Sequence, residues 1–420
     1  MQKDSCTPTS FHLISGVYGI NMSLTLSKKA MAVKPSSTLA ITAKAKELKA
    51  QGLDVVGFGA GEPDFNTPEN ICNVAIEAIN SGFTKYTPAS GIIELKEAIS
   101  KKFKNFNGLD YKPSQIVVSN GGKHSLTNVF EAILNPGDEV IIPAPYWLSY
   151  PEIVKLADGV PVYVYGGKEQ GYKINAKQLQ EVTTEKTKAL VLNTPNNPTG
   201  MIYTEEELRE IADYVVKNDI YVIADEMYEN LVYAGEKHVS IASFNEEIYK
   251  RTITVSGLAK SYAMTGWRIG YTGSSEEIAK LMGSLQSHQT SNPNSIAQKA
   301  AVEALNGDQS TVEAMCKEFD ERRKYMYERV CGIDLIESAE PLGAFYVFID
   351  ISKVLEKSYK GQKIETAEYF AKVLLEDYYV AVVPCADFGF ADHIRLSYAI
   401  SKEQIKKGLD RIEEFINNLQ

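Results

Sequence analysis

Residues 188–229 read KALVLNTPNNPTGMIYTEEELREIADYVVKNDIYVIADEMYE, and this stretch predicts a strand–helix–strand unit. Its two apolar runs, KALVLNT and IYVIADE, are almost continuous in aliphatic residues, which is typical of strands that are buried on both faces. Residues 204–217, between them, read as a helix. A buried strand, a helix and a second buried strand in succession indicate a parallel sheet covered by helices.

The same alternation extends over residues 115–275. Further helical segments lie at 123–134, 149–157 and 275–287. Five more apolar runs read as strands, namely QIVVSN, EVIIPA, VPVYVY, RTITVSG and RIGYTG. We therefore predict an α/β fold with a mostly parallel, seven-stranded sheet that is flanked by helices.

The sequence on either side of this region predicts a second, smaller α+β domain. Residues 38–51 and 68–81 read as helices around a short apolar strand, DVVGFG. A long amphipathic helix is predicted at 309–330 and a terminal helix at 402–418. Between them lie the short strand candidates GAFYVFIDI, YYVAVVPC and HIRLSYA.

These patterns suggest three regions. We expect a large domain at 61–304, and a small domain formed by 28–60, with its N-terminal arm, and by 305–420. Residues 1–27 are expected to be a disordered tail, since they lack the basic head and long apolar run of a secretory signal. A mis-assigned start upstream of Met22 is the other interpretation.

Composition excludes several classes of partner. The chain has 420 residues, which favours two domains, and a formal net charge of −10, which argues against nucleic-acid binding. No apolar run is long enough to span a membrane. The five cysteines are scattered, odd in number and without metal-binding spacing, so we expect reduced thiols and a cytoplasmic protein.

Polar residues follow several of the predicted strands, where an open α/β sheet places its ligands. After QIVVSN come Gly121, Gly122 and Lys123 at the start of a helix, where backbone N–H groups and the helix dipole favour a phosphate. A plain connection between strand and helix is the alternative. After KALVLNT, the loop PNNPTG either forms an ordinary turn or holds the amide of Asn197 towards a ligand.

The next two strand ends carry charge. Asp225 ends the apolar run IYVIA and needs a positive partner, which could be a protein cation or the cationic ring nitrogen of a cofactor. Tyr228 could place its phenol nearby. Lys260 follows TITVSGLA among apolar and small residues, with Arg268 further on. A lysine desolvated beside other cations has a lowered pKa and can form a Schiff base.

A phosphate site, a buried acid and a lysine nucleophile together are the parts that pyridoxal phosphate needs. The sequence resembles the class I aminotransferases of fold type I, and it looks closest to the bacterial-type aspartate aminotransferases. The resemblance runs from about Lys28 to the C-terminus. It rests on seven blocks in family order: GEPDFNTP, YTPASG, PYWLSYPE, NTPNNPTG, ADEMYE, SGLAKSYAMTGWRIGY and HIRLSYA.

The resemblance implies a role for individual residues. Lys260 would hold pyridoxal phosphate covalently, Asp225 would pair with its ring nitrogen, and Trp147 would stack on its ring. Tyr228 and Asn197 would bond the ring hydroxyl. The phosphate would be bound by Gly121, Gly122, Lys123, Ser256 and Arg268, and by Tyr86 of a neighbouring subunit, which implies a homodimer with shared active sites.

The resemblance also implies substrates. Arg395 would bind the α-carboxylate of an amino acid, and Gly61 would allow substrate close to the backbone. We expect a ping-pong transamination between L-aspartate and 2-oxoglutarate, with Lys34 and Lys123 as candidate partners of the distal carboxylate. Prephenate, aromatic or alanine-type substrates are the alternatives within the activity. A β-lyase, an aminocyclopropane-carboxylate synthase and a non-enzymatic ligand-binding regulator are the alternatives outside it.

Overall fold

The computed structural model describes residues 25–35 and 37–420. The chain divides into two compact units, residues 1–34 and 35–420. In the first unit the described residues form the short helix α1 (Lys28–Met31), where Ser27 Oγ accepts a hydrogen bond from the Ala30 N–H. The predicted disordered tail, 1–27, falls almost entirely outside the described residues.

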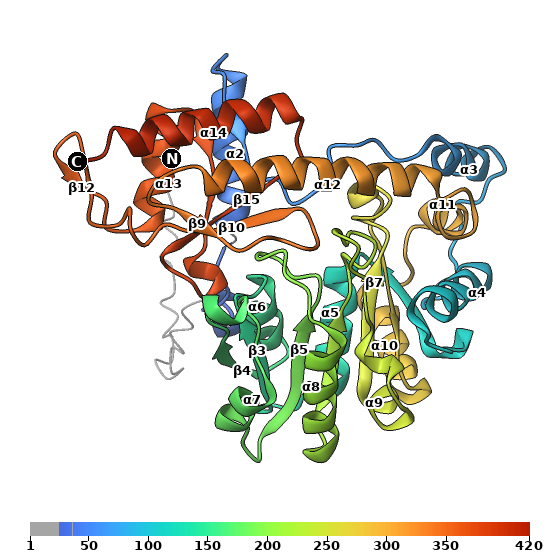
Figure 1. Cartoon of the computed structure of the whole chain (residues 1–420). Coiled ribbons are helices and arrows are strands. Elements are labelled where there is room, and N and C mark those ends of the chain that lie inside the picture. Colours follow the sequence, from blue (N-terminus) through green and yellow to red (C-terminus); the bar gives the residue numbers. More distant parts are fainter. Residues whose placement is uncertain (1–24, 36) are drawn as a thin grey trace, which may run out of the picture. The chain divides into compact units, whose positions relative to one another are not determined.

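A seven-stranded sheet forms the centre of residues 116–273, as predicted, with the order β2-β8-β7-β6-β5-β3-β4 (Figure 1). Strand β8 pairs antiparallel with both of its neighbours, and the other pairs are parallel. The strands are β2 (Ile116–Asn120), β3 (Glu139–Ala144), β4 (Val160–Tyr165), β5 (Thr187–Asn193), β6 (Tyr221–Asp225), β7 (Thr252–Gly257) and β8 (Ile269–Gly273).

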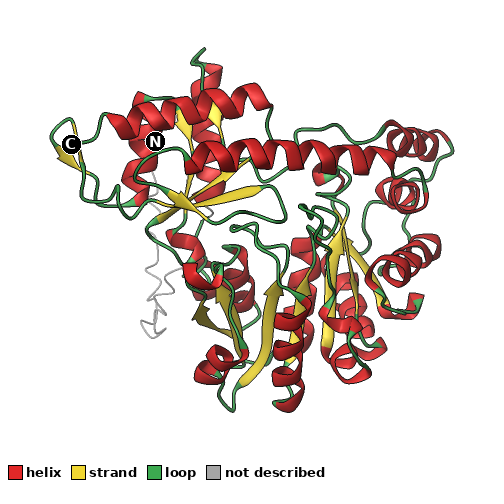
Figure 2. Ribbon diagram, viewed as in Figure 1, coloured by secondary structure: helices red, strands yellow, loops and turns green. Residues whose placement is uncertain are grey.

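Helices cover both faces of this sheet (Figure 2). Along β3, Val140 and Ile142 belong to a core formed with α5 (Gly122–Ile133), α6 (Ser149–Leu156) and α10 (Glu276–Gln289). Ile141, between them, belongs to a separate core with α7 (Ala176–Val182), α8 (Glu205–Lys217) and α9 (Glu246–Arg251). Alternate side chains of a strand point to opposite faces, so these nearly continuous apolar runs are explained by burial on both sides.

The β2–β8 edge of the sheet is covered by further helices. Ile116, Val118 and Tyr271 pack in one core with α3 (Glu69–Asn80), α4 (Ile93–Lys102) and α11 (Ser295–Asn306). The sequence pattern predicted α3 but neither α4 nor α11. Of the described helices, none is both long and apolar enough to cross a membrane.

A second sheet lies in the C-terminal part of the chain, with the order β14-β15-β10-β9 and only antiparallel pairs. Its strands are β9 (Glu337–Ser338), β10 (Tyr346–Asp350), β14 (Val383–Pro384) and β15 (His393–Ser397). Two short pairs accompany it: the parallel pair of β1 (Val56–Gly57) with β13 (Val380–Ala381), and the hairpin of β11 (Ser358–Tyr359) with β12 (Gln362–Lys363).

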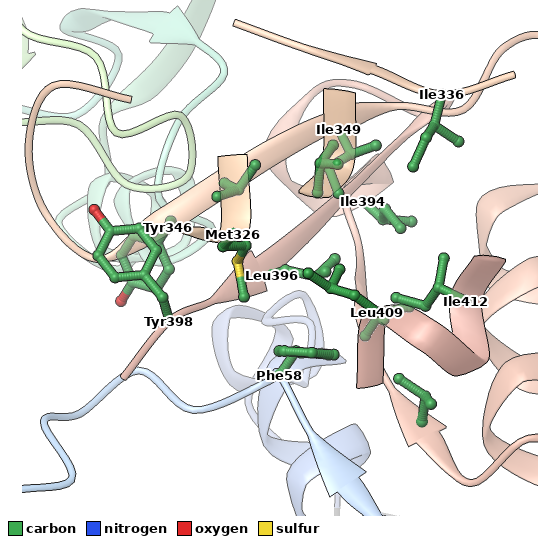
Figure 3. Close-up of a cluster of buried hydrophobic side chains, with 14 of the residues drawn as sticks. Phe58, Met326, Ile336, Tyr346, Ile349, Ile394, Leu396, Tyr398, Leu409 and Ile412 are labelled. Atoms are coloured by element: carbon green, nitrogen blue, oxygen red, sulfur yellow. The ribbon is translucent and has the colours of Figure 1, made fainter. Parts of the chain in front are cut away.

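The second sheet packs in its own core, which Figure 3 shows around Met326, Ile349 and Leu396. Helices α12 (Ser310–Cys331), α13 (Ala367–Asp377) and α14 (Lys402–Asn417) contribute to this core. The remaining helix, α2 (Ser37–Ala50), packs in a small cluster with Val55 and Ala381. Helix α12 links two cores, since Met315 belongs to the core at the β2–β8 edge and Met326 to this one.

Gly408, in the middle of α14, shows how closely this core is packed. A Cβ added there would lie 2.3 Å from the Phe58 ring and 2.9 Å from a Val56 methyl. Gly→Ala normally stabilises a helix interior by about 0.5–1 kcal/mol, whereas overpacking costs about 1–3 kcal/mol. We expect Gly408→Ala to lower the free energy of unfolding by about 1–2 kcal/mol. Urea denaturation, monitored by circular dichroism, measures this change.

Gly283 provides the matched control, because it also lies inside a helix, α10, but its added Cβ would meet only Ser90 at 3.8 Å. Gly283→Ala is therefore expected to leave the stability unchanged or to raise it. Equal stability of the two variants would contradict the close contact at Gly408.

Candidate active site

Predicted site residues converge where neighbouring parallel strands end. Asp225 is the last residue of β6, Asn197 lies in the loop after β5, and Lys260 lies in the loop after β7. Because β5, β6 and β7 are adjacent and parallel, their carboxyl ends meet at one edge of the sheet. The structure brings these three residues together there.

Asp225 is a buried carboxylate with neutral hydrogen-bond donors. It is 5% exposed, and it accepts hydrogen bonds from the Tyr150 hydroxyl at 2.6 Å and from the Met227 N–H at 3.1 Å. Burial raises the pKa of Asp225 to about 6, against the lowering effect of these two bonds. Among the described residues, no lysine or arginine forms an ion pair with it. Asp225 therefore suits a cationic ligand.

Lys260 has the properties of a nucleophilic amine. Its Nζ donates a hydrogen bond to the Gly61 carbonyl oxygen. Burial lowers the pKa of Lys260 to about 8, Arg268 and Arg395 act in the same direction, and Glu62 opposes them. The lowered pKa increases the unprotonated fraction of the amine at neutral pH, which a lysine nucleophile requires.

The predicted phosphate site is formed where α5 begins. Gly121 caps the helix with a φ of +87°, and Gly122 and Lys123 form its first turn. A Cβ on Gly121 would lie 2.3 Å from Nη2 of Arg268, so only glycine allows the guanidinium this close. The Thr265 carbonyl orients Arg268 by accepting from Nη1 at 2.9 Å. Helix N–H groups, an arginine and a lysine together form an anion site.

Arg395 is a second, more deeply buried candidate for binding an anion. It is 2% exposed, and its two Nη atoms donate to the Asn197 side-chain oxygen at 2.8 Å and to the Gly59 carbonyl at 3.3 Å. Its Nε is buried and has no hydrogen-bond acceptor among the described residues. Such a donor is costly unless a ligand satisfies it. A carboxylate, which can accept a bidentate pair of bonds, fits this requirement.

Tyrosines connect these residues. The Tyr228 and Tyr346 hydroxyls are 2.9 Å apart, and the Arg395 guanidinium lies 4.3 Å from the centre of the Tyr346 ring. Burial, reinforced by Tyr346, holds the pKa of Tyr228 well above its usual value, so its phenol stays protonated. Tyr346 comes from β10, and therefore both sheets contribute to the site.

Trp147 also contacts residues of the site. Its ring lies 5.0 Å from Lys123 Nζ and packs edge-on against Tyr150, with the ring centres 5.3 Å apart. Tyr150 in turn bonds Asp225. Desolvation, and then the positive charge of Arg268, lower the pKa of Lys123. Trp147 thus connects the phosphate site to the buried acid.

Ser256 bonds a residue outside the predicted phosphate site. Its side chain is fully buried, and its hydroxyl donates a hydrogen bond to the carboxylate of Glu229, which also pairs with Lys102. The phosphate contact of Ser256 stays a prediction, and this hydrogen bond does not support it. A strand end fixes where a residue lies along the sheet, but the alternation of side chains decides which face it points to.

The structure does not test the roles of two predicted residues. The Tyr86 side chain is 90% exposed, and its predicted contact is with a second subunit, which a single chain does not contain. Lys34 belongs to the first unit of the chain. The roles of both residues stay predictions.

Two residues of the site were missed from the sequence. Tyr150 lies one helical turn beyond Trp147 in PYWLSYPE, and this spacing was the available signal. Tyr346 lies within the apolar strand GAFYVFIDI, where a phenol needs a partner when buried. Neither pattern indicates which distant residue the phenol contacts.

Comparison with known proteins identifies the family. Residues 53–412 match the model of the family "Aminotransferase class I and II". The chain is 50% identical to an aspartate aminotransferase of Bacillus sp. (strain YM-2), over 93% of this chain and 99% of that protein. It is 47% identical to a probable aspartate/prephenate aminotransferase of Aquifex aeolicus, over 94% and 99%. The crystal structure of the aspartate aminotransferase from Rhizobium meliloti superposes with a TM-score of 0.91 at 40% identity, covering 95% of this chain and 100% of that one.

The chain therefore belongs to the class I and II aminotransferases, whose cofactor is pyridoxal 5′-phosphate. The residues of the site fit this cofactor. Asp225 is a buried acid without an ion-pair partner among the described residues, and Lys260 is a partly buried amine of lowered pKa. The space beside Gly121 admits a guanidinium where a Cβ would not fit.

Gly121→Ala tests the anion site. The added methyl would force Arg268 away, and the left-handed backbone of Gly121 disfavours alanine by about 1–2 kcal/mol. We expect the affinity of the apoprotein for pyridoxal phosphate to fall about tenfold or more, measured by absorbance titration.

Gly266 serves as the control, because it lies near Arg268 in the sequence and its added Cβ would meet nothing within 4 Å. Gly266→Ala should retain the affinity of the unmodified protein. If both variants bind the cofactor equally well, the anion site is placed wrongly.

Proposed function

We propose that the protein catalyses ping-pong transamination between L-aspartate and 2-oxoglutarate, with Lys260 as the catalytic amine. The observation that carries this proposal is the partly buried Lys260 amine, whose pKa is affected by the charges of Arg395 and Asp225, both of them buried. The specific substrate is supported by the 50% identity to an aspartate aminotransferase.

Asp225, Tyr228 and Asn197 would orient the cofactor. When bound, pyridoxal phosphate supplies an aldehyde that condenses with amines and a ring that accepts electrons from a substrate carbanion. The Asp225 carboxylate would hold a proton on the pyridine nitrogen, since an adjacent cation favours its ionised form. Tyr228 and Asn197 would bond the ring hydroxyl, and Trp147 would lie against the ring face.

Arg395 and Lys260 would act on the substrate. The two-pronged guanidinium of Arg395 would bind the α-carboxylate, and the carboxylate would satisfy the buried Nε–H. The unprotonated Nζ of Lys260 would accept the proton of the substrate α-carbon, which its lowered pKa favours. Gly61, whose carbonyl accepts from Lys260, would leave room for the substrate beside the backbone.

The phosphate would be bound by the first turn of α5, at Gly121, Gly122 and Lys123, together with Arg268. We extend the proposal to a homodimer in which Tyr86 reaches the phosphate of the neighbouring subunit. The 90% exposure of this aromatic side chain supports an intermolecular role. A phenol this exposed is free to meet a partner without rearrangement of its own chain.

We also propose a domain organisation and a cellular location for this protein. We propose separate domains at 61–304 and at 305–420 with 28–60, because the two sheets pack in separate cores. We further propose that the protein is cytoplasmic. The support is that the four described cysteines, Cys72, Cys316, Cys331 and Cys385, are free thiols.

Visible absorbance of the purified protein tests the proposed activity. Bound pyridoxal phosphate should give an absorbance band in the visible range, which we call the visible cofactor band. L-Aspartate added without a 2-oxo acid should abolish this band, and 2-oxoglutarate should restore it. Lys260→Ala should still bind the cofactor but lose turnover by at least about 10⁴-fold, because the group that moves the proton is missing. Lys280→Ala, which removes an exposed lysine, should remain fully active. A fully active Lys260→Ala would disprove the assignment.

A second test asks which cation binds the distal carboxylate of L-aspartate. The candidates are Lys123 and Lys34. Loss of a charged hydrogen bond costs about 1.5–3 kcal/mol. Lys123→Ala should therefore lower kcat/KM for L-aspartate about 10- to 100-fold more than for L-alanine. Lys123→Arg keeps the charge and should retain most of the preference. An unchanged ratio in Lys123→Ala would leave Lys34 as the remaining candidate.

Prephenate is the second candidate substrate, because one relative at 47% identity is named a probable aspartate/prephenate aminotransferase. The test adds each amino donor separately to the purified protein. If L-aspartate leaves the absorbance band of the bound cofactor unchanged, and the amino acid formed from prephenate abolishes it, the result would favour prephenate as the substrate.

A further inference from the structure

A separate group of charged residues is buried next to the proposed site. Glu226 directly follows Asp225, the last residue of β6, and Glu229 directly follows Tyr228; the two glutamates are 1% and 2% exposed. Asp225 and Tyr228 bond Tyr150 and Tyr346, whereas the glutamates bond a different set of residues.

Glu229 is held by three donors. Lys102, at the end of α4, forms an ion pair with it. Ser256, in β7, donates its hydroxyl proton to the same carboxylate. Asn107, in the π-helical turn η1 (Phe103–Asn107), lies with its Nδ2 2.8 Å from the second carboxylate oxygen. Although burial opposes it, the positive charge of Lys102 lowers the pKa of Glu229, so the carboxylate is ionised.

Glu226 is held by a second set that shares Asn107. The Asn107 Nδ2 lies 2.9 Å from Glu226, and the Ser240 hydroxyl donates to Glu226 at 2.6 Å. The imidazole Nε2 of His238 lies 2.9 Å from the same carboxylate oxygen. Lys102 Nζ also donates to Asn107 Oδ1, at 2.9 Å, and thereby closes the network.

His238 determines the net charge of this cluster. The charged groups that face it are Glu226 and Glu229, from the segment after β6, and Lys102, from α4. With Lys102 positive, the two carboxylates leave one negative charge, which a protonated His238 neutralises. Burial acts to lower the pKa of His238, but Glu226 and then Glu229 outweigh it, and the pKa is raised.

A metal ion is the other way to neutralise such a cluster. One ligand atom from each of Glu226, Glu229 and His238 lies within 4.8 Å of the others. The ammonium of Lys102, however, already contacts Glu229, and a metal ion there would bring two cations together. The arrangement therefore favours a protonated histidine.

We propose that Lys102, Asn107, Glu226, Glu229 and His238 form a charge-balanced positioning cluster, in which His238 carries a proton. The cluster fixes the segment that presents Asp225 and Tyr228, and through Ser256 it contacts β7, the strand that leads to Lys260. The inference rests on the proposed function, because that function gives Asp225, Tyr228 and Lys260 their roles.

The cluster also sets the electrostatic potential at the site. The charge of Glu226 contributes to the raised pKa of Asp225. Loss of a positive charge from the cluster makes the potential more negative and favours protonated forms nearby. Loss of a negative charge has the opposite effect. Removing one charge of the cluster should therefore shift a titration at the site with a sign that follows the charge removed.

The test is a pH titration of the visible cofactor band in the holoenzyme. Lys102→Met and His238→Gln should raise the pH midpoint by about half a unit, the order expected for one partly screened charge. Glu229→Gln should lower it by a similar amount. The double variant Lys102→Met/Glu229→Gln, which removes one charge of each sign, should titrate close to the unmodified enzyme.

A rate measurement accompanies the titration. Lys102→Met leaves Glu229 buried without its cation, so the half-reaction with L-aspartate should slow about 10- to 100-fold, and the double variant should recover part of that loss. If Lys102→Met does not fold, as judged by circular dichroism, Glu229→Gln and His238→Gln still give shifts of opposite sign.

Several outcomes would overturn the inference alone. These are folded variants that all titrate at the midpoint of the unmodified enzyme, shifts of one sign for all variants, or a stoichiometric metal ion in the purified protein that Glu229→Gln removes. By contrast, an unmodified enzyme whose cofactor band does not respond to L-aspartate or to any other amino donor would overturn the proposed function itself.

Discussion

Burial of the Asp225 carboxylate is the constraint on which the rest of the site depends. Removing an ionised carboxylate from water costs several kcal/mol unless a charge or hydrogen bonds compensate. The chain provides two neutral donors, and the pKa rises to about 6. The carboxylate is therefore poised for a cationic ligand whose arrival would favour its ionised form. Cofactor binding and the ionisation of Asp225 are linked for this reason.

The cations of the site come from distant parts of the chain. Lys260 follows a strand of the large sheet, whereas Arg395 lies in β15 of the second sheet, and Asn197 joins the two through its bond to Arg395. Their separation is therefore set by how the two sheets pack. Helix α12 contributes residues to a core beside each sheet, at Met315 and Met326, and so helps to fix that packing.

Much of this arrangement could be predicted because it depends on local patterns. Nearly continuous aliphatic runs revealed the seven strands, and a strand end followed by a polar residue revealed Asp225 and Lys260. Contacts between distant residues could not be predicted in this way. The Lys102–Glu229 pair spans 127 positions, and the bond between Tyr228 and Tyr346 spans 118. The hydrogen bond of Ser256 to Glu229 could not be predicted for a related reason, because a strand end does not show which face a side chain takes.

The segment from Asp225 to Glu229 shows why the site and the buried cluster are difficult to change separately. Its residues form a turn in which the Glu229 N–H bonds the Glu226 carbonyl at 3.0 Å. Asp225 and Tyr228 consequently point to the tyrosines of the site, while Glu226 and Glu229 point to Asn107 and its cations. Since the backbone is shared, a rotation that relieves an unpaired glutamate also moves the phenol of Tyr228. A substitution that leaves either glutamate unpaired would therefore also disturb Tyr228, and loss of the Glu226 charge would change the ionisation of Asp225.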